Sequence, residues 1–126
     1  MRAVDTNVLV RLLARDDAAQ ASSASRFIAV GAWVSQLVLA ETIWVLESVY
    51  ERSPAQLIAA LDLLLAHESL VLQDADTVAA ALENFRLKPG LGFSDCLVLE
   101  IARRAGHTPL GSFDKNLSRL AGVQRL

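Results

Sequence analysis

The sequence is poor in cysteine, proline, glycine and aromatic residues, and these shortages exclude several classes of protein. A single cysteine, Cys96, cannot form an internal disulfide or a zinc site of paired cysteines, and it is compatible with a reducing compartment. Six glycines and three prolines exclude collagen and low-complexity chains. A basic excess is also missing, because the formal net charge is −2. A passive nucleic-acid coat protein is therefore disfavoured, since such proteins carry strong positive charge.

Long hydrophobic runs are absent as well. Glu41, Glu47 and Asp62 interrupt the most apolar stretches, so none approaches the roughly 20 apolar residues of a membrane span. The first residues lack a long apolar segment and a clear cleavage site, so we expect no secretory signal and a cytoplasmic location. Hydrophobic residues still make up 53% of the 126 residues, enough for a large core. We predict a single domain over residues 1–126.

Short β-compatible segments alternate with helical patterns along the chain. Strands are predicted at residues 2–4, 33–35, 70–72, 108–110 and 123–126. Helices are predicted at residues 8–15, 18–30, 36–50, 54–66 and 75–87, and a sixth from a cap at Ser94 to about residue 105. Asp74 is the predicted cap of the fifth helix, and the third is apolar nearly all round, which predicts burial. The alternation predicts an α/β fold, with a short parallel sheet flanked by helices.

Four acidic residues stand out, although each has a structural explanation when taken alone. Asp5 follows the first strand and can cap a helix, and Asp95 in a first helical turn suits the helix dipole. Asp114 lies in a turn after the fourth strand. Glu41 can be an acid at the margin of a buried helix face, but no Lys or Arg lies within one helical turn to pair with it.

Taken together, the four acids indicate a metal site. A parallel α/β topology collects strand ends and helix starts at one edge of the sheet. Two carboxylates about 4 Å apart repel by about 4 kcal/mol at an effective dielectric of 20, so such a cluster needs a cation. Oxygen ligands suit Mg²⁺ or Mn²⁺, and such a site is well adapted to phosphodiester hydrolysis. By contrast, His67 and His107 are interpreted as helix-end or turn residues, and Cys96 as a packing residue.

The sequence resembles PIN-domain ribonucleases, and more narrowly the VapC-type toxins of bacterial toxin–antitoxin pairs. Four blocks in order carry the resemblance: VDTNVLVRLL, WVSQLVLAETIWVLE, GFSDCLVLEIARRAG and SFDKNLSRLAGV. The resemblance covers the whole chain. It implies a PIN-like three-layer sandwich and a metal-dependent endoribonuclease.

The resemblance also implies roles for individual residues and partners. The acids that hold Mg²⁺ or Mn²⁺ and carry catalysis would be Asp5, Glu41, Asp95 and Asp114. Supporting groups that orient ligands or water would be Thr6, Asn7 and Ser112. The implied partners are an RNA substrate, a cognate antitoxin and a second copy of the chain. Candidate phosphate contacts, each also explicable as a solvated surface charge, are Arg11, Arg15, Arg86, Lys88 and Lys115.

Two other interpretations remain open at the level of sequence. A receiver domain of two-component signalling has similar length and alternation, but it needs an acid pair where Asp5 stands alone, and its central acid does not lie inside a helix as Glu41 does. A structural or binding module would use the acids as caps and the apolar helices as a partner groove. The variant Asp5→Asn separates this module from an enzyme, because an amide preserves capping and weakens metal binding.

Overall fold

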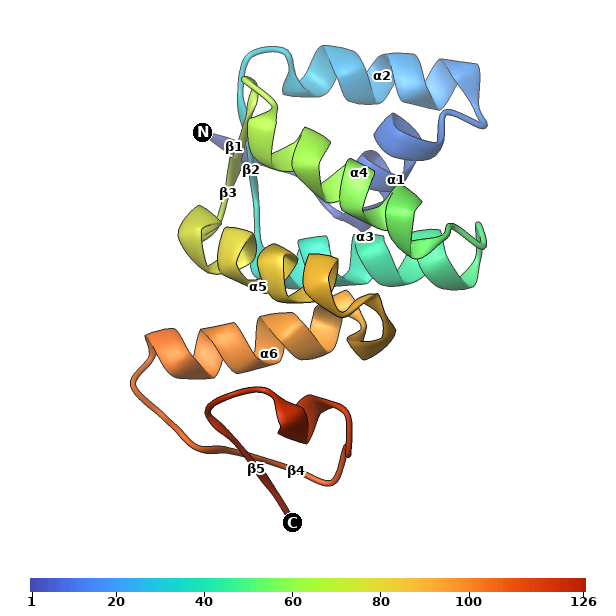
Figure 1. Cartoon of the computed structure of the whole chain (residues 1–126). Helices are drawn as coiled ribbons and strands as arrows, with labels where there is room; N and C mark the ends of the chain where they lie inside the picture. The colour runs from blue at the N-terminus through green and yellow to red at the C-terminus, as the bar shows by residue number, and fades with distance from the viewer. The chain divides into compact units, whose positions relative to one another are not determined.

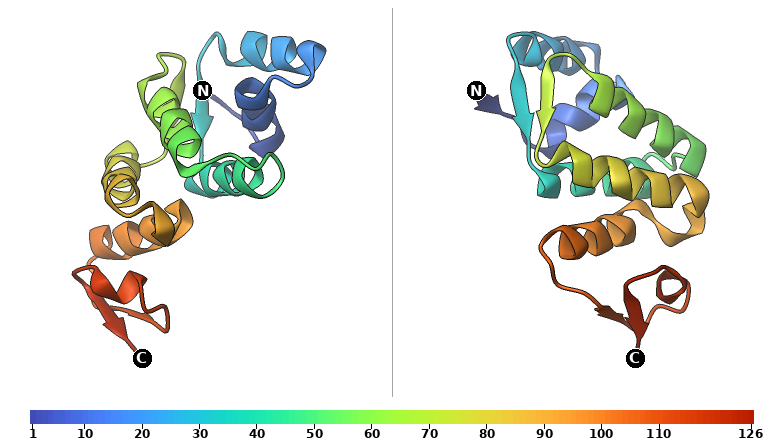
Figure 2. Two further views of the ribbon diagram at one scale, coloured as in Figure 1. Left: turned by 45° about the vertical axis from the view of Figure 1, so that its right-hand side comes forward. Right: turned by 60° about the vertical axis from the view of Figure 1, so that its left-hand side comes forward.

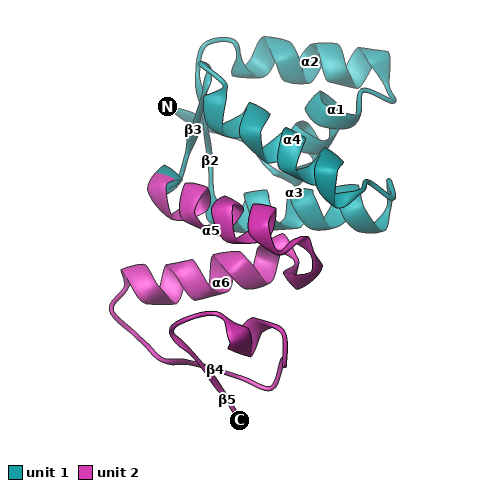
Figure 3. Cartoon of the chain, in the orientation of Figure 1, with its two compact units in different colours: residues 1–75 teal, residues 76–126 magenta.

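A computed structural model describes residues 1–126, in which six α-helices and two short 3-10 helices alternate with five short strands (Figure 1). This order confirms the predicted α/β class. The chain forms two compact units, Met1–Ala75 and Asp76–Leu126, which are described separately (Figure 3). None of the helices is long and apolar enough to span a membrane.

The first unit is built on a three-stranded parallel sheet. Strands β1 (Arg2–Ala3), β2 (Ala32–Val34) and β3 (Leu70–Leu72) lie in that order. Helices α1 (Thr6–Ala14) and α2 (Ala18–Ile28) connect the first two strands, and α3 (Gln36–Ser48) and α4 (Pro54–Ala66) connect the next two. Parallel crossovers are nearly always right-handed, so two successive ones in the same direction place their helices on one face. Figure 1 and the right-hand view of Figure 2 show all four helices to one side of the strands.

Burial alternates along β2 and β3. In β2, Ala32 and Val34 are buried while Trp33 between them is exposed, and in β3 Val71 is exposed between two buried leucines. Trp33 and Val71 are register partners on neighbouring strands, so they share one face. The helices fill the core with side chains that are at most 1% exposed: Leu9, Leu39, Leu57, Leu61 and Leu64.

Side-chain caps explain where the helices of this unit begin. Ser35 Oγ accepts from the Val38 backbone N–H at 3.1 Å, and Ser53 forms the reciprocal capping box with Gln56. Asp5 caps α1 itself, so the helix begins at Thr6 rather than at the predicted residue 8. Helix α2 ends at Ile28 rather than at residue 30, close to Gly31, whose φ of 97° favours glycine.

The prediction that the third helix is buried nearly all round is wrong. Helix α3 buries the stripe Leu39, Thr42, Ile43 and Leu46, whereas Leu37 and Trp44 are 69% and 61% exposed. The helix packs only this one stripe of side chains against its neighbours, so the apolar residues on its opposite face remain exposed. Glu41 is exposed on the helix and lies one turn from Leu37 and from Trp44.

The second unit contains α5 (Ala75–Leu87), α6 (Phe93–Arg104) and a two-stranded parallel pair, β4 (Leu110–Ser112) with β5 (Val123–Arg125). The 3-10 turn η1 (Pro89–Leu91) joins the two helices, and η2 (Leu117–Arg119) lies between the two strands. Phe85 and Phe93 pack edge to face with ring centroids 6.2 Å apart, which fixes the end of α5 against the start of α6.

Three local predictions in this part of the chain are wrong. Helix α6 begins at Phe93 after Gly92, whose φ of 79° ends the preceding 3-10 turn, so Ser94 lies inside the first turn and does not cap. Strand β4 is Leu110–Ser112 rather than 108–110, because Pro109 has no N–H for a ladder, whereas the Leu110 N–H donates to the Gly122 carbonyl at 2.8 Å. Asp74 has a φ of 47°, which differs from the extended backbone of an N-cap.

Candidate active site

The first unit brings Asp5, Thr6 and Glu41 to the N-terminus of α1. Asp5 Oδ1 accepts from the Val8 backbone N–H at 3.3 Å, which is the predicted capping contact. Thr6 Oγ1 donates to Glu41 Oε2 at 2.9 Å, so the hydroxyl next to Asp5 fixes the carboxylate of α3. Both acids are exposed, and each keeps a second carboxylate oxygen without a hydrogen-bond partner. Glu41 is therefore held by the residue that follows Asp5, and both acids face solvent.

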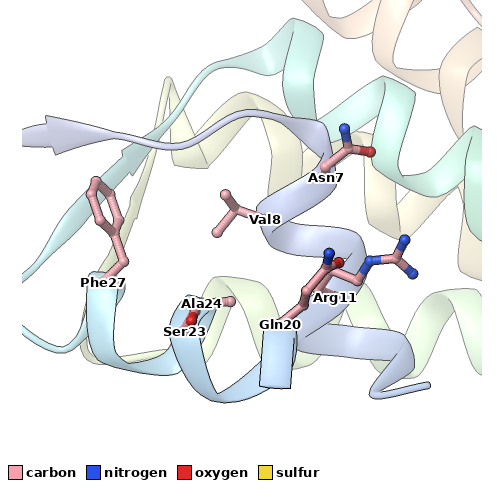
Figure 4. Close-up of a pocket in the computed structure, with 7 residues that line it drawn as sticks. All are labelled: Asn7, Val8, Arg11, Gln20, Ser23, Ala24 and Phe27. Atoms are coloured by element: carbon pink, nitrogen blue, oxygen red, sulfur yellow. The ribbon is translucent and has the colours of Figure 1, made fainter. Parts of the chain in front are cut away.

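Asn7 lies in a different environment. It lines a hollow of about 380 Å³ between α1 and α2, together with Val8, Arg11 and residues of α2 (Figure 4). No hydrogen bond joins Asn7 to either acid of this unit. The structure thus places Thr6, but not Asn7, in contact with a candidate acid.

The second unit brings Asp95 and Asp114 together. Asp95 lies in the first turn of α6, and Asp114 lies in the turn that follows β4. Asp95 is exposed but its carboxyl is partly desolvated by its neighbours, which raises its pKa above the ordinary value of 3.8, and the negative charge of Asp114 raises the pKa further. The charge of Asp114 therefore acts on Asp95 within this unit.

Ser112 and the backbone of the following turn fix Asp114. The Asp114 backbone N–H donates to Ser112 Oγ at 3.0 Å. Asp114 Oδ1 accepts from the backbone N–H groups of Asn116 at 2.8 Å and of Leu117 at 3.1 Å. The second carboxylate oxygen has no hydrogen-bond partner. The Ser112 hydroxyl thus positions Asp114 by accepting a hydrogen bond from the backbone N–H of that acid. Ser112 was predicted as a supporting residue.

The donor set fits a hard divalent cation. All four acids are exposed, and each leaves at least one oxygen free, which is the ligand type that Mg²⁺ and Mn²⁺ prefer. Within neither unit do three or more His, Cys, Asp or Glu side chains gather into a metal-binding group. Each unit therefore offers one pair of acids, and in the second unit a cation would relieve the like-charge repulsion between Asp95 and Asp114.

Cys96 and the histidines have the structural roles that the sequence predicts. Cys96 is fully buried. Burial is the main reason that the pKa of its thiol is raised to about 11, so the thiol remains protonated. His67 caps the C-terminus of α4 and accepts a hydrogen bond at Nδ1 from the Ser69 backbone N–H at 3.1 Å. His107 follows Gly106, and its backbone N–H donates to the Ala102 carbonyl at 2.9 Å, which closes the end of α6.

Two residues of structural importance escaped the sequence analysis. Glu100 of α6 is buried, accepts from Asn84 Nδ2 of α5 at 2.9 Å and pairs with Arg103 at 3.4 Å. Arg103 also donates to the Ala121 carbonyl at 2.9 Å, just before β5. This network ties α5, α6 and the C-terminal strand pair together within the second unit. The signal in the sequence was weaker than for Glu41, because Glu100 has arginines three and four residues later that can pair with it.

The basic residues predicted to contact phosphates differ in whether their side chains already have hydrogen-bond partners in the chain. Arg11 donates to Asp16 Oδ1 and to the Tyr50 hydroxyl, both at 3.1 Å, so it is held in a corner of the first unit. Arg15 donates to Ser25 Oγ at 3.3 Å, and Arg86 pairs with Glu83 at 3.4 Å. Lys88 instead lines a hollow in the second unit.

Comparison with known proteins assigns the family. The family model of the PIN domain matches residues 2–123. The crystal structure of Mycobacterium tuberculosis VapC20, described as a sarcin-ricin loop cleaving toxin, is 22% identical over 98% of this chain and 97% of that chain, with a TM-score of 0.45. No curated protein sequence matches the chain significantly.

The similarity to that toxin is low in both identity and TM-score, so the assignment rests on the family model, which covers nearly the whole chain. The match confirms the resemblance to PIN domains that the four sequence blocks carry and the α/β fold class that the alternation of strands and helices predicts, and it supports an RNA-cleaving hydrolase. The chain belongs to the PIN-domain family.

Proposed function

We propose that the chain is a divalent-metal-dependent endoribonuclease, and that it is the toxin of a toxin–antitoxin pair of the VapC type. The observation that carries the proposal is the state of the four predicted acids. Each is exposed and keeps an unbonded carboxylate oxygen, and two are fixed by neighbouring hydroxyl groups, Glu41 by Thr6 and Asp114 by Ser112. A cap or turn role also leaves one carboxylate oxygen free, but it does not explain Asp95, which makes no side-chain hydrogen bond and is repelled by the charge of Asp114.

In this proposal residues 1–126 act as one domain, and each unit contributes one pair of acids. Asp5, Glu41, Asp95 and Asp114 would hold Mg²⁺ or Mn²⁺. A bound cation of this kind polarises a phosphodiester and lowers the pKa of an attacking water. The chain's own contribution is orientation, because Thr6 holds the Glu41 carboxylate and Ser112 holds the backbone of Asp114.

We also propose two protein partners and a location. The exposed apolar residues Leu37 and Trp44 on α3 support an interface with another chain, either a second copy or an antitoxin. An antitoxin that silences the enzyme would need to cover the acids, and Glu41 lies on the same exposed side of α3 as these two residues. A single buried thiol suits a reducing cytoplasm, where an RNA substrate is available.

The test uses total bacterial RNA and the full chain free of any antitoxin. New RNA ends are mapped by sequencing after incubation with Mg²⁺ or Mn²⁺, with excess chelator, and with the Asp5→Asn protein. We expect new ends only with a divalent ion and the unmodified chain. Total RNA is essential, because an enzyme with one narrow target is silent on an arbitrary oligonucleotide. Absence of new ends under all conditions, together with no metal binding, would instead support an interaction module.

A further inference from the structure

We propose that the second unit carries a subsite for the RNA strand, in which Lys88 and Arg119 hold backbone phosphates and Phe113 stacks on a base. This inference rests on the proposed function, since it names how that enzyme would grip its substrate. It concerns residues outside the four acids.

The first observation is a hollow with two unpaired cations. A cavity of about 370 Å³, within the roughly 300–1,000 Å³ typical of ligand sites, is lined by Lys88, Gly90, Leu91, Asn116 and Arg119. Lys88 and Arg119 are exposed, and neither side chain makes a hydrogen bond or an ion pair. No acidic residue lines the hollow. Two free cations on one concave surface suit an anion with several oxygens, such as the phosphates of a nucleic-acid backbone.

The second observation is that two 3-10 turns build this hollow. Lys88 precedes η1 and accepts from the Leu91 backbone N–H at 3.1 Å, while Arg119 ends η2, where its own backbone N–H donates to the Asn116 carbonyl at 3.2 Å. Backbone hydrogen bonds therefore fix the Cα positions of both cations. A Cβ added at Gly90 meets nothing within 4 Å, so the chain leaves this wall of the hollow open.

The third observation connects the hollow with a candidate catalytic acid. The Asn116 backbone N–H donates to Asp114 Oδ1 at 2.8 Å, so one wall of the hollow belongs to the turn that fixes Asp114. Phe113, directly before that acid, is 80% exposed. Phe113 does not itself line the hollow, but it is three residues before Asn116, which does, and unpaired RNA bases stack on exposed aromatic rings. The residues from Phe113 to Asn116 thus combine a stacking ring, an acid and a wall of the cationic hollow.

The test measures RNA binding separately from cleavage. A fluorescein-labelled single-stranded RNA of about twelve nucleotides, long enough to cover the site of a typical single-strand-binding domain, is titrated with the full chain in excess chelator. Fluorescence anisotropy gives the affinity at several salt concentrations. Chelator prevents metal-dependent cleavage, so a failure of this proposal is distinguishable from a failure of the proposed function. That function is scored by Asp114→Asn in the cleavage assay with metal.

The charge variant is Lys88→Gln/Arg119→Gln. Each phosphate contact on a single strand contributes a slope of about −0.7 to log K against log salt, or about fivefold in affinity at about 0.1 M salt. We therefore expect the double variant to bind about 25-fold more weakly and to show a slope shallower by about 1.4. The matched control Arg26→Gln/Arg104→Gln removes the same charge from exposed positions outside the hollow and should change both quantities much less.

Two further variants keep the proposal testable. Phe113→Leu should weaken binding by about fivefold to 150-fold with an unchanged salt slope, because stacking is not ionic. Gly90→Asp removes no side chain and has open space, so it should fold normally and weaken binding through repulsion of the phosphates. The proposal is overturned if the unmodified chain does not bind RNA in chelator, or if the control double variant loses as much affinity as the Lys88 and Arg119 variant. It is also overturned if an acidic peptide binds in the hollow and the affinity of the chain for RNA is the same with and without that peptide.

Discussion

Replacing Asp95 by asparagine should stabilise the metal-free chain and at the same time remove its response to a divalent cation. Burial and the charge of Asp114 both disfavour the ionised form of Asp95, as its raised pKa shows. The amide removes that charge and keeps nearly the same shape. Because the side chain is exposed, the gain should stay below about 1 kcal/mol, which is up to about 4 °C in Tm for a chain of this length.

The loss of the metal response should be larger than this gain. A cation at a hundredfold excess over its Kd stabilises the folded state by about 2.7 kcal/mol, or about 10 °C. We expect this shift in the unmodified chain and much less of it in Asp95→Asn. The assay is thermal unfolding followed by far-ultraviolet circular dichroism, with chelator and with Mn²⁺ or Mg²⁺. A clear fall in Tm of the variant in chelator, or an undiminished metal shift, would refute the reasoning.

The pH dependence of stability should have a definite sign. The pKa of Asp95 is raised in the folded state, so ionisation destabilises the fold at every pH above that folded value. As the pH falls through the folded pKa towards the ordinary value of 3.8, the folded chain takes up the proton first and the penalty disappears. Metal-free protein should therefore gain stability relative to Asp95→Asn on acidification through this window. Urea unfolding of both proteins at several pH values measures the difference, and an opposite trend would contradict the assigned cause.

Two further substitutions test the contacts around the acids and the core of the second unit. Thr6→Val removes the hydroxyl that donates to Glu41, so metal affinity and RNA cleavage should each fall about tenfold. Thr6→Ser keeps the hydroxyl and should retain both. Isothermal titration calorimetry measures the metal affinity, and the RNA assay measures cleavage. Equal activity of Thr6→Val and Thr6→Ser would show that the contact is unimportant. Glu100→Ala leaves the donors of Asn84 and Arg103 without their acceptor and should cost about 2 kcal/mol in urea unfolding, more than Glu100→Gln. A loss below about 0.5 kcal/mol, the usual range for surface substitutions, would mean that the network is replaced by water.

Elements with a local chemical signal could be predicted from the sequence. The capping box of Ser53 and Gln56 has a short-range cause, and the helix that it opens has the predicted bounds, Pro54–Ala66. Strand β3 also has its predicted bounds, Leu70–Leu72. Strand β4 lies two residues later than predicted, because a run of apolar residues does not show which backbone N–H groups find an acceptor.

Features that depend on tertiary contacts could not be predicted in the same way. The apolar sequence of α3 predicts a buried helix, yet its residues Leu37 and Trp44 are exposed. Hydrophobicity alone does not show whether the surface that covers a residue belongs to the same chain. The pairing of the two basic residues in the hollow could not be predicted from the sequence either. Lys88 and Arg119 lie far apart in the sequence and meet only through two 3-10 turns. By contrast, the contacts of Thr6 with Glu41 and of Ser112 with Asp114 join residues that the sequence had already singled out.

The central claim is that acids from both units hold one kind of cation, and Mn²⁺ binding tests it most directly. Electron paramagnetic resonance distinguishes free from bound Mn²⁺ during titration of the full chain and of four variants: Asp5→Asn, Glu41→Gln, Asp95→Asn and Asp114→Asn. The account predicts that every variant remains folded and binds Mn²⁺ at least about tenfold more weakly, or about 1.4 kcal/mol. Undiminished Mn²⁺ affinity in both variants of either unit would contradict a metal-binding role for that unit's pair of acids.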